Sequence, residues 1–268
     1  MAINYENLVI DGIDTVTGFD RTTGDLSFIF DQPKSGSLEN ANDTIYQTGK
    51  QGMQLSAIDR NKTSTFSCEN AYVVTGGLAA QTGSDVDIMS ADNKVIVPDF
   101  QRLTLASATT VVLPHVPVGV TGAEVQYVWK INADGTQGEK LVVSDTVSTG
   151  KFTVNAESKT ITFAEGEFDS ADSEVYVSYE YEASEGIHIA NNGEKFSKTV
   201  RLLIDVMLRD KCDNNIVYHG KIVYPVAKVD GNFTIEFGEE PSVHSFSAQA
   251  LVDVCRKDKT LWDLYVVA

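Results

Sequence analysis

Residues 107–186 contain four short runs with the composition of β-strands: TTVVL (109–113), VQYVW (125–129), KTITF (159–163) and VYVSYEY (175–181). Turn-forming residues separate these runs, and the Asp-Gly pair at 134–135 is a strong hairpin signal. Strands at such short spacing predict a small β-sandwich. The stretch lacks the Cys…Trp…Cys spacing of antibody domains, so the term Ig-like describes its expected architecture only.

The segments on either side of this stretch cannot each complete a sheet, but together they can form one. We therefore expect a mainly β protein in which one β domain interrupts another. The expected parts are a discontinuous β domain of residues 1–106 and 187–268 and an inserted Ig-like β-sandwich domain of residues 107–186.

The run TVRLLIDVMLR (199–209) alternates with period two, as a half-buried strand does. One face of this strand carries only apolar residues: Val200, Leu202, Ile204, Val206 and Leu208. The opposite face offers a candidate subunit-interface strand, because long two-faced strands can meet a neighbouring chain. Its members are Arg201, Leu203, Asp205 and Met207.

Three later segments should continue the same sheet. Residues 216–227 return as the partner of the strand at 199–209, and residues 262–267 close the sheet. Residues 244–254 permit a helix as well as a strand. The alternation of Phe246, Ala248, Ala250, Val252 and Val254 favours the strand.

A long hairpin is predicted near the N-terminus, with arms at residues 37–43 and 53–59 and a polar, Gly-rich tip around 46–52. Residues 62–68 alternate as a separate half-buried strand. A long exposed loop in a small domain commonly contacts another subunit. The alternative is a variable loop without a partner. The candidate contact residues at the tip are Tyr46, Gln47, Lys50 and Gln51.

One helix is expected, over residues 71–81, with Asn70 as its cap. Tyr72, Val73, Leu78 and Ala79 would share one face of this helix. The adjacent glycines at positions 76 and 77 weaken the prediction, because each glycine costs about 1 kcal/mol in a helix interior.

Composition places this chain among ordinary globular proteins. No apolar run is long enough to span a bilayer, so no membrane association is expected. The start, MAINYENLVI, has no basic residue and does not resemble a signal peptide. Cys68, Cys212 and Cys255 are odd in number and widely spaced, which argues against a disulfide framework or a zinc site. These features favour synthesis in a reducing cytoplasm.

The formal net charge of −17 is large and is shared between the expected insert and its flanks. No basic stripe offers a footprint for phosphate groups, which argues against tight nucleic-acid binding. A surface past which DNA moves without sticking is still compatible with this charge, because like charges repel the DNA backbone. The alternative is that the acidic residues serve solubility alone.

No constellation for catalysis or cofactor binding is evident. The four histidines, at 115, 188, 219 and 244, do not pair at metal-ligand spacing, and the nucleophile-elbow, zinc-protease and phosphate-loop motifs are absent. The acidic run at 165–174 lacks the spacing of a calcium loop, so a solvated turn is favoured over a calcium site. Enzyme activity and cofactors are therefore not expected.

Aromatic residues of the expected insert allow two interpretations. If exposed, Trp129, Tyr176, Tyr179 and Tyr181 would form a stacking platform for sugars; if buried, they are ordinary core. We favour the core.

The flanks resemble the major tail protein, or tail tube protein, of long-tailed bacteriophages. The resemblance covers most of residues 1–106 and 187–268. It rests on four stretches: AINYENLVI (2–10), TSTFSCENAYVVTGGLAAQ (63–81), GKIVYPVAKVDGNFTIEFG (220–238) and KDKTLWDLYV (257–266).

This resemblance implies a tail-tube-like β-sandwich or barrel with one flanking helix. It also implies six subunits per ring, with their sheets joined into a continuous barrel and with rings stacked through loops such as the hairpin at 37–59. The implied partners are other copies of the chain and tail proteins such as the tape measure and tail terminator. DNA would transit the tube without specific binding, and the virion tail would be the final location after synthesis in the host bacterial cytoplasm. The alternatives are a capsid or decoration protein, and a β-sandwich glycan-binding adhesin.

Overall fold

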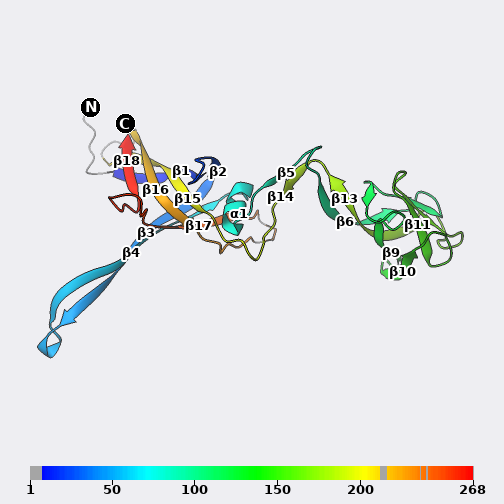
Figure 1. The fold of residues 1–268 in the computed structure, drawn as a ribbon, viewed down its shortest axis with the longest axis horizontal. Helices are drawn as coiled ribbons and strands as arrows, with labels where there is room; N and C mark the ends of the chain where they lie inside the picture. The colour runs from blue at the N-terminus through cyan, green and yellow to red at the C-terminus, as the bar shows by residue number, and fades with distance from the viewer. Residues whose placement is uncertain (1–7, 212–215, 236, 240, 268) are drawn as a thin grey trace. The chain divides into compact units, whose positions relative to one another are not determined.

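The computed structural model describes residues 8–211, 216–235, 237–239 and 241–267. Within these residues the chain is mainly β, with eighteen strands, one α-helix and one 3-10 helix. It divides into two compact units, Met1–Val86 with Ile189–Ala268, and Asp87–His188. Figure 1 gives the labels that are used below. None of the helices in the described part is long and apolar enough to cross a membrane.

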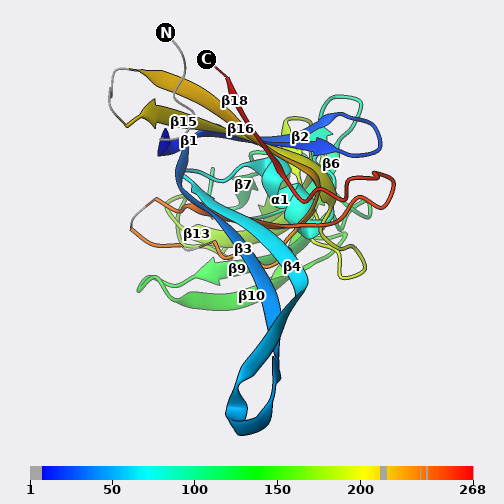
Figure 2. The same ribbon diagram turned by 90° about the vertical axis from the view of Figure 1, so that its left-hand side faces the viewer.

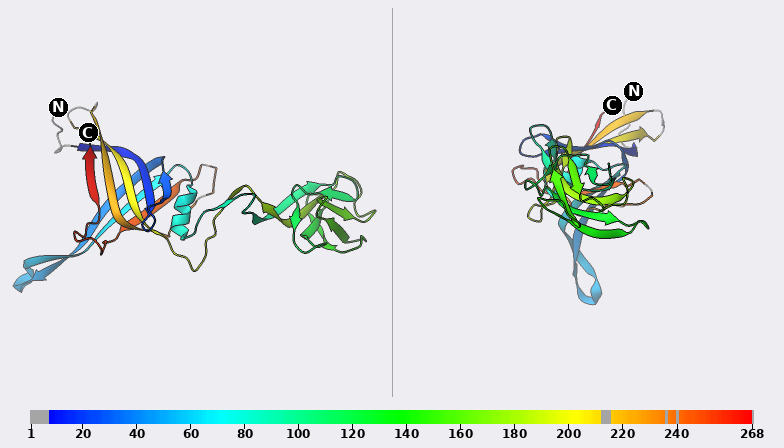
Figure 3. Two further views of the ribbon diagram at one scale, coloured as in Figure 1. Left: turned by 45° about the horizontal axis from the view of Figure 1, so that its top comes forward. Right: turned by 90° about the vertical axis from the view of Figure 1, so that its right-hand side faces the viewer.

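One sheet organises the first unit, in the strand order β2-β1-β15-β16-β17-β4-β3, with β18 paired to β16. Figure 3 shows how strongly this sheet curves. The bounds of its strands are β1 Leu8–Asp20, β2 Leu26–Phe30, β3 Pro33–Thr48, β4 Gln54–Asn70, β15 Thr199–Asp210, β16 Val217–Val229, β17 His244–Ala250 and β18 Asp263–Val267.

The alternation predicted for residues 199–209 is confirmed. Strand β15 buries Val200, Leu202, Ile204, Val206 and Leu208. These side chains pack with Phe28 and Phe30 of β2, Phe66 of β4 and Phe246 of β17 in one core. The concave side of the curved sheet thus holds the apolar core, and this places the alternate residues of β15 on the other face.

Strand β17 is shorter than the predicted run at 244–254. Phe246, Ala248 and Ala250 are buried as expected, but the strand ends at Ala250. Strand β16 pairs with β17 at residues 227–229 and with β18 at residues 219–223. The chain leaves the sheet after Leu251, whose N–H donates to the Val226 C=O at 2.9 Å, before it reaches the part of this edge where β18 pairs. Val252 and Val254 are consequently exposed.

Helix α1 (Thr75–Thr82) begins four residues later than predicted, and Asn70 does not cap it. The Asn70 side chain instead joins two loops, accepting from Gln32 N–H and donating to Tyr72 C=O. Tyr72 and Val73 precede the helix and are exposed.

The two glycines of α1 permit close packing of the helix on the sheet. A Cβ on Gly77 would lie 2.7 Å from the Phe30 ring and 3.0 Å from His244. A Cβ on Gly76 would overlap the Ser27 carbonyl oxygen. The glycines that weakened the helix prediction are therefore what lets the helix contact β2 and β17.

The second unit contains β5 Asp87–Met89, β6 Val95–Thr104, β7 Thr110–Val112, β8 Pro117–Val118, β9 Val125–Ile131, β10 Gln137–Val143, β11 Lys151–Asn155, β12 Thr160–Phe163, β13 Glu174–Ala183 and β14 Gly186–His188. The main sheet order is β6-β13-β9-β10-β11-β12-β7, and its inner faces share one core. Tyr179 is buried in this core, and Tyr181 packs partly against it. For these two residues the core interpretation is confirmed.

The second unit begins earlier than residue 107. Strand β6 pairs along its whole length with β13, so residues 95–104 belong with the second unit. Strand β6 contains a proline at position 98. Proline is tolerated there because β6 is an edge strand. Whether the unit is an Ig-like insert that folds alone stays a prediction.

Candidate assembly surfaces

The hairpin of β3 and β4 is longer than predicted. The strands pair from Pro33 opposite Asn70 to Thr48 opposite Gln54, so the strand expected at 62–68 is the lower half of β4. Figures 1 and 2 show the two strands continuing as a ribbon beyond the rest of the first unit. From residue 39 to residue 62 almost every side chain is exposed. This ribbon receives no support from a core.

Both faces of the ribbon carry apolar side chains near the tip. Ile45 lies opposite Ile58, and Tyr46 lies opposite Ala57. Since successive residues of a strand point to opposite faces, these two pairs lie on different faces. Leu55 lies at a register shift, between Ser56 opposite Gln47 and Gln54 opposite Thr48. Ile45, Tyr46, Leu55 and Ile58 are 50%, 51%, 64% and 50% exposed. We call these residues the tip patch.

The predicted tip residues lie on or beside this patch. Tyr46 and Gln47 are in β3, and Lys50 and Gln51 are in the 3-10 turn Lys50–Gly52, where Gln51 adopts φ 65°. The expected polar character of the tip is incomplete, because Ile45, Leu55 and Ile58 were missed. In the sequence these three residues are scattered apolar positions within a polar segment. Only the pairing of β3 with β4 shows that they lie near one another.

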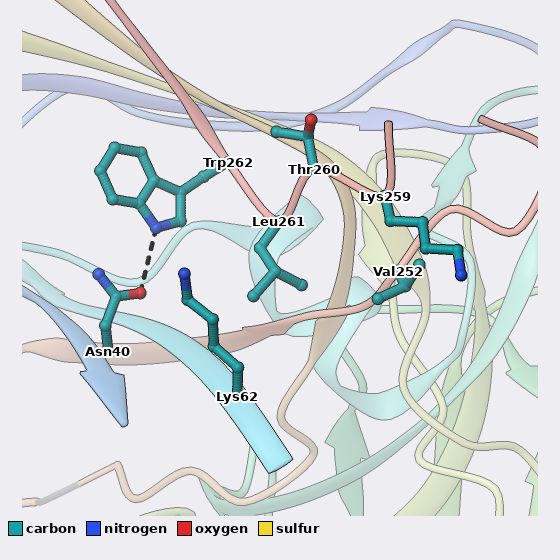
Figure 4. A pocket seen from close by; sticks show the side chains of 7 residues that line it. All are labelled: Asn40, Lys62, Val252, Lys259, Thr260, Leu261 and Trp262. Carbon is teal, nitrogen blue, oxygen red and sulfur yellow. Dashed lines mark hydrogen bonds between the residues drawn. The ribbon is translucent and has the colours of Figure 1, made fainter. Parts of the chain in front are cut away.

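A hollow of about 400 Å³ lies at the root of the ribbon (Figure 4). The Trp262 indole N–H donates to Asn40 Oδ1 at 3.1 Å and ties the segment before β18 to β3. Val252 and Leu261 add apolar walls, and Lys62 and Lys259 also line the hollow. No ion pair is seen for either lysine within the described residues. The hollow is thus basic in a strongly acidic chain.

The predicted interface strand lies on the outer face of β15. Arg201 is exposed, and Leu203, Asp205 and Met207 are half-buried. Asp205 accepts from Thr15 Oγ1 at 3.0 Å and pairs with Lys221 of β16. On this face the carboxylate of Asp205 is therefore neutralised by the ammonium group of the neighbouring strand. Because these pairs are partly exposed, each contributes about 0–1 kcal/mol to stability.

The sheet has unpaired edges at which another chain can be added. Within the described residues β2 pairs only with β1, and β18 pairs only with β16. Leu26 and Ile29 of β2 are 56% and 42% exposed, and Leu264 and Tyr265 of β18 are 51% and 54% exposed. Exposed apolar edges are templates for pairing with another strand. The sequence showed the strands but not which of them lie at the edge.

The histidines do not form a reactive centre. His244 is fully buried, accepts from Val74 N–H through Nδ1 and lies 2.7 Å from Gln81 Oε1 through Nε2. Burial lowers the pKa of His244 below its ordinary value. His115 stacks on Tyr181, and His188 lies near Asp87. Nowhere in the described ranges do three or more His, Cys, Asp or Glu residues gather as metal ligands.

The acidic run at 165–174 includes a buried ion pair. Glu167 is buried, pairs with Lys130 and accepts from Gly150 N–H at 2.8 Å. The pKa of Glu167 is lowered, because these contacts outweigh the opposing effect of burial. The ligands of this carboxylate are thus Lys130 and the Gly150 N–H, and its contacts stabilise the second unit.

A comparison with protein families gives one match that covers nearly the whole chain. The model of the YomU/Tube protein family matches residues 8–263, a range that includes both compact units. No curated protein matches the chain.

Proposed function

The chain belongs to the YomU/Tube protein family, a family of phage tail tube proteins, and we propose that it self-assembles into stacked rings, six subunits to a ring, that form a DNA-conducting tube. The family is structural, and its members are not normally enzymes. Its match includes the hairpin, the curved sheet and the second unit. The resemblance to tail tube proteins that was noted in the sequence is thereby confirmed.

The tip patch is the observation that carries the proposal of self-assembly. A two-stranded hairpin is marginally stable in water when nothing packs against it. Here both faces of such a hairpin expose large apolar side chains, from Ile45 and Tyr46 to Leu55. A partner that covers both faces removes this surface from water. A neighbouring ring of the same chain supplies such a partner in a tube.

The edges of the curved sheet support lateral pairing within a ring. Strands β2 and β18 are available for the edges of neighbouring sheets, and the outer face of β15 lies between them in the same sheet. Joining several sheets edge to edge produces a closed barrel without free edges. Leu203 and Met207, both half-buried on this face, would then lie in the middle of each subunit's part of the barrel wall, two strands from either joined edge.

The charge distribution supports the passage of DNA. The chain is strongly acidic, and the ion pairs of Asp205 with Lys221 and of Asp11 with Arg209 leave no uncompensated basic row on the β15 face. A surface without a row of unpaired Lys and Arg side chains gains no affinity for DNA from the release of counterions. Tape-measure and tail-terminator proteins are the proposed further partners in the virion tail.

The test is assembly of the purified full chain. We expect concentrated protein to form hollow tubes or stacked rings in negative-stain electron microscopy, and rings of six in two-dimensional averages. Closed shells would instead favour the capsid or decoration alternative. Protein that stays monomeric even when added to preformed tail initiation complexes would refute self-assembly.

A further inference from the structure

Four aromatic rings gather on the outer face of the main sheet of the second unit. Phe100 comes from β6, Tyr127 and Trp129 from β9, and Tyr176 from β13. Tyr176 lies opposite Trp129, and Ser178 lies opposite both Phe100 and Tyr127. We call these four rings the aromatic platform.

The rings of the platform form a continuous chain of contacts. The centroids of Phe100 and Tyr176 lie 5.4 Å apart with planes only 16° from parallel. Phe100 and Trp129 are 6.1 Å apart, and Trp129 and Tyr127 are 5.4 Å apart. These spacings are comparable to the length of one pyranose ring.

The platform lies on the solvent side of the sheet. Val175, Val177 and Tyr179 of β13 point to the buried core, so Tyr176 between them points the other way. Phe100 is 60% exposed and Tyr127 is 42% exposed. Trp129 and Tyr176 are half-buried. A half-buried sheet normally places polar side chains on this face, so a ring cluster that presents Phe100 and Tyr127 to solvent indicates a binding surface.

Polar side chains frame the rings. Arg102 pairs with Glu174 beside Tyr176. The ammonium group of Lys140 lies 3.8 Å from the centroid of Tyr127, and no ion pair is seen for it within the described part of the chain. The frame therefore offers hydrogen-bond donors from Arg102 and Lys140 and an acceptor from Glu174.

The size of the platform argues against a second copy of the chain as its occupant. At about 200 Å² per aromatic side chain, two exposed and two half-buried rings offer roughly 300 Å². A stable chain–chain interface needs about 800 Å² from each partner and is depleted of charge at its centre. Here charged side chains adjoin the rings directly. The surface suits a small ligand that is apolar on its faces and polar at its edges.

We propose that the aromatic platform binds a saccharide chain. A pyranose ring has C–H groups on its faces and hydroxyl groups around its rim, which match the rings and the polar frame respectively. Phe100 and Tyr176, whose ring planes are nearly parallel, offer a stacking surface for one sugar, and Trp129 contacts the next sugar with its ring inclined at 63° to Phe100. Lys140 and Arg102 donate to hydroxyl or carboxylate oxygens. This binding surface lies on the second unit and does not depend on tube formation.

The test uses the full chain with two probes, chitohexaose as a neutral saccharide and a galacturonic-acid hexamer as an acidic one. The chain has two tryptophans, so Trp262→Phe leaves Trp129 as the only indole fluorophore. We expect one probe to shift the emission of Trp129. In calorimetry on the wild-type chain, Phe100→Ser and Trp129→Ser should each weaken binding of that probe by about tenfold or more.

A matched control is Val120→Ser, which changes a 76% exposed apolar residue of the same unit outside the platform and should leave binding unchanged. Circular dichroism checks that each variant is folded. Three results would overturn the proposal: no binding of either probe at millimolar concentration, equal binding by folded Phe100→Ser and wild-type protein, or self-association that Phe100→Ser abolishes.

Discussion

Replacing the apolar residues of the tip patch should block assembly while leaving the subunit folded. The sharpest change is the double variant Leu55→Ser with Ile58→Ser, because Leu55 is the most exposed residue of the tip patch and Ile58 lies opposite Ile45 across the ribbon. In the free subunit Leu55 is 64% exposed and Ile58 is 50% exposed. Exposed substitutions of this kind change the free energy of unfolding by about 0.5 kcal/mol or less.

In the assembled tube the same side chains would be covered. Complete burial of a leucine or isoleucine contributes about 1.5–3 kcal/mol. Scaled by the exposed fractions of Leu55 and Ile58, the two residues together contribute about 2.5 kcal/mol per hairpin contact. A loss of this size raises the critical concentration for assembly by roughly fiftyfold to one hundredfold, since 1.4 kcal/mol corresponds to tenfold.

Sedimentation of tubes over a concentration series measures this critical concentration, and thermal unfolding of the dilute subunit measures its stability. Val120→Ser serves as the control, because it removes a residue that is 76% exposed and lies outside the hairpin. An unchanged critical concentration for the double variant would refute the reasoning. So would an equal rise for the control, because the effect would then reflect general surface hydrophobicity.

Three further predictions concern the first unit. Gly77→Ala should lower the free energy of unfolding by about 1–3 kcal/mol in urea titrations, because the new Cβ would lie 2.7 Å from the Phe30 ring. This loss should exceed the gain from the better helix propensity of alanine, and a stabilised variant would contradict the packing. Burial keeps His244 neutral and lowers its pKa. Below pH 6.5 the unfolded chain binds a proton at this side chain and the folded chain does not, so the free energy of unfolding should fall as the pH drops below 6.5. His244→Phe should remove this pH dependence and lower the free energy of unfolding by about 2–3 kcal/mol, and an unaltered slope would contradict the prediction. Burial raises the pKa of the Cys68 thiol to about 12, so this thiol should not react with iodoacetamide at pH 8 until urea unfolds the chain. Peptide mass spectrometry should find exposed Cys255 alkylated and Cys68 unmodified, and modification of Cys68 in the folded chain would disprove its burial.

The strands were predictable where one face is buried, because burial imposes a period of two. Strand β15 follows this rule along its whole length. The hairpin ribbon does not, since no core lies on either side, and its apolar residues follow no simple period. Its full length and its tip patch depended on pairing between β3 and β4, which the sequence does not display. Cys212 lies outside the described residues, so its expected lack of a disulfide partner stays a prediction.

Edges and boundaries were harder to predict than strands. Strands β17 and β18 share one edge of β16, at residues 227–229 and 219–223, and this arrangement cannot be read from the local sequence of either strand. The assignment of β6 to the second unit depends likewise on its pairing with β13. Local sequence shows that a segment can be a strand, whereas its neighbours in the sheet decide where it ends.

For the aromatic residues of the second unit, strand alternation and strand register together decide which rings are buried and which face solvent. Tyr176, Tyr179 and Tyr181 lie within one strand, yet Tyr179 is core, Tyr181 is half-buried against it, and Tyr176 faces outward. The core was the favoured interpretation for this set and Trp129. It is wrong for Trp129 and Tyr176, which are half-buried and lie outside the core, because strand alternation divides the set. Only the register of β13 with β6 and β9 adds Phe100 and Tyr127, neither of which was singled out in the sequence. Assembly surfaces on the first unit and a ligand surface on the second thus use separate residues, so substitutions in the platform can be tested for saccharide binding in a chain whose hairpin and sheet edges are intact.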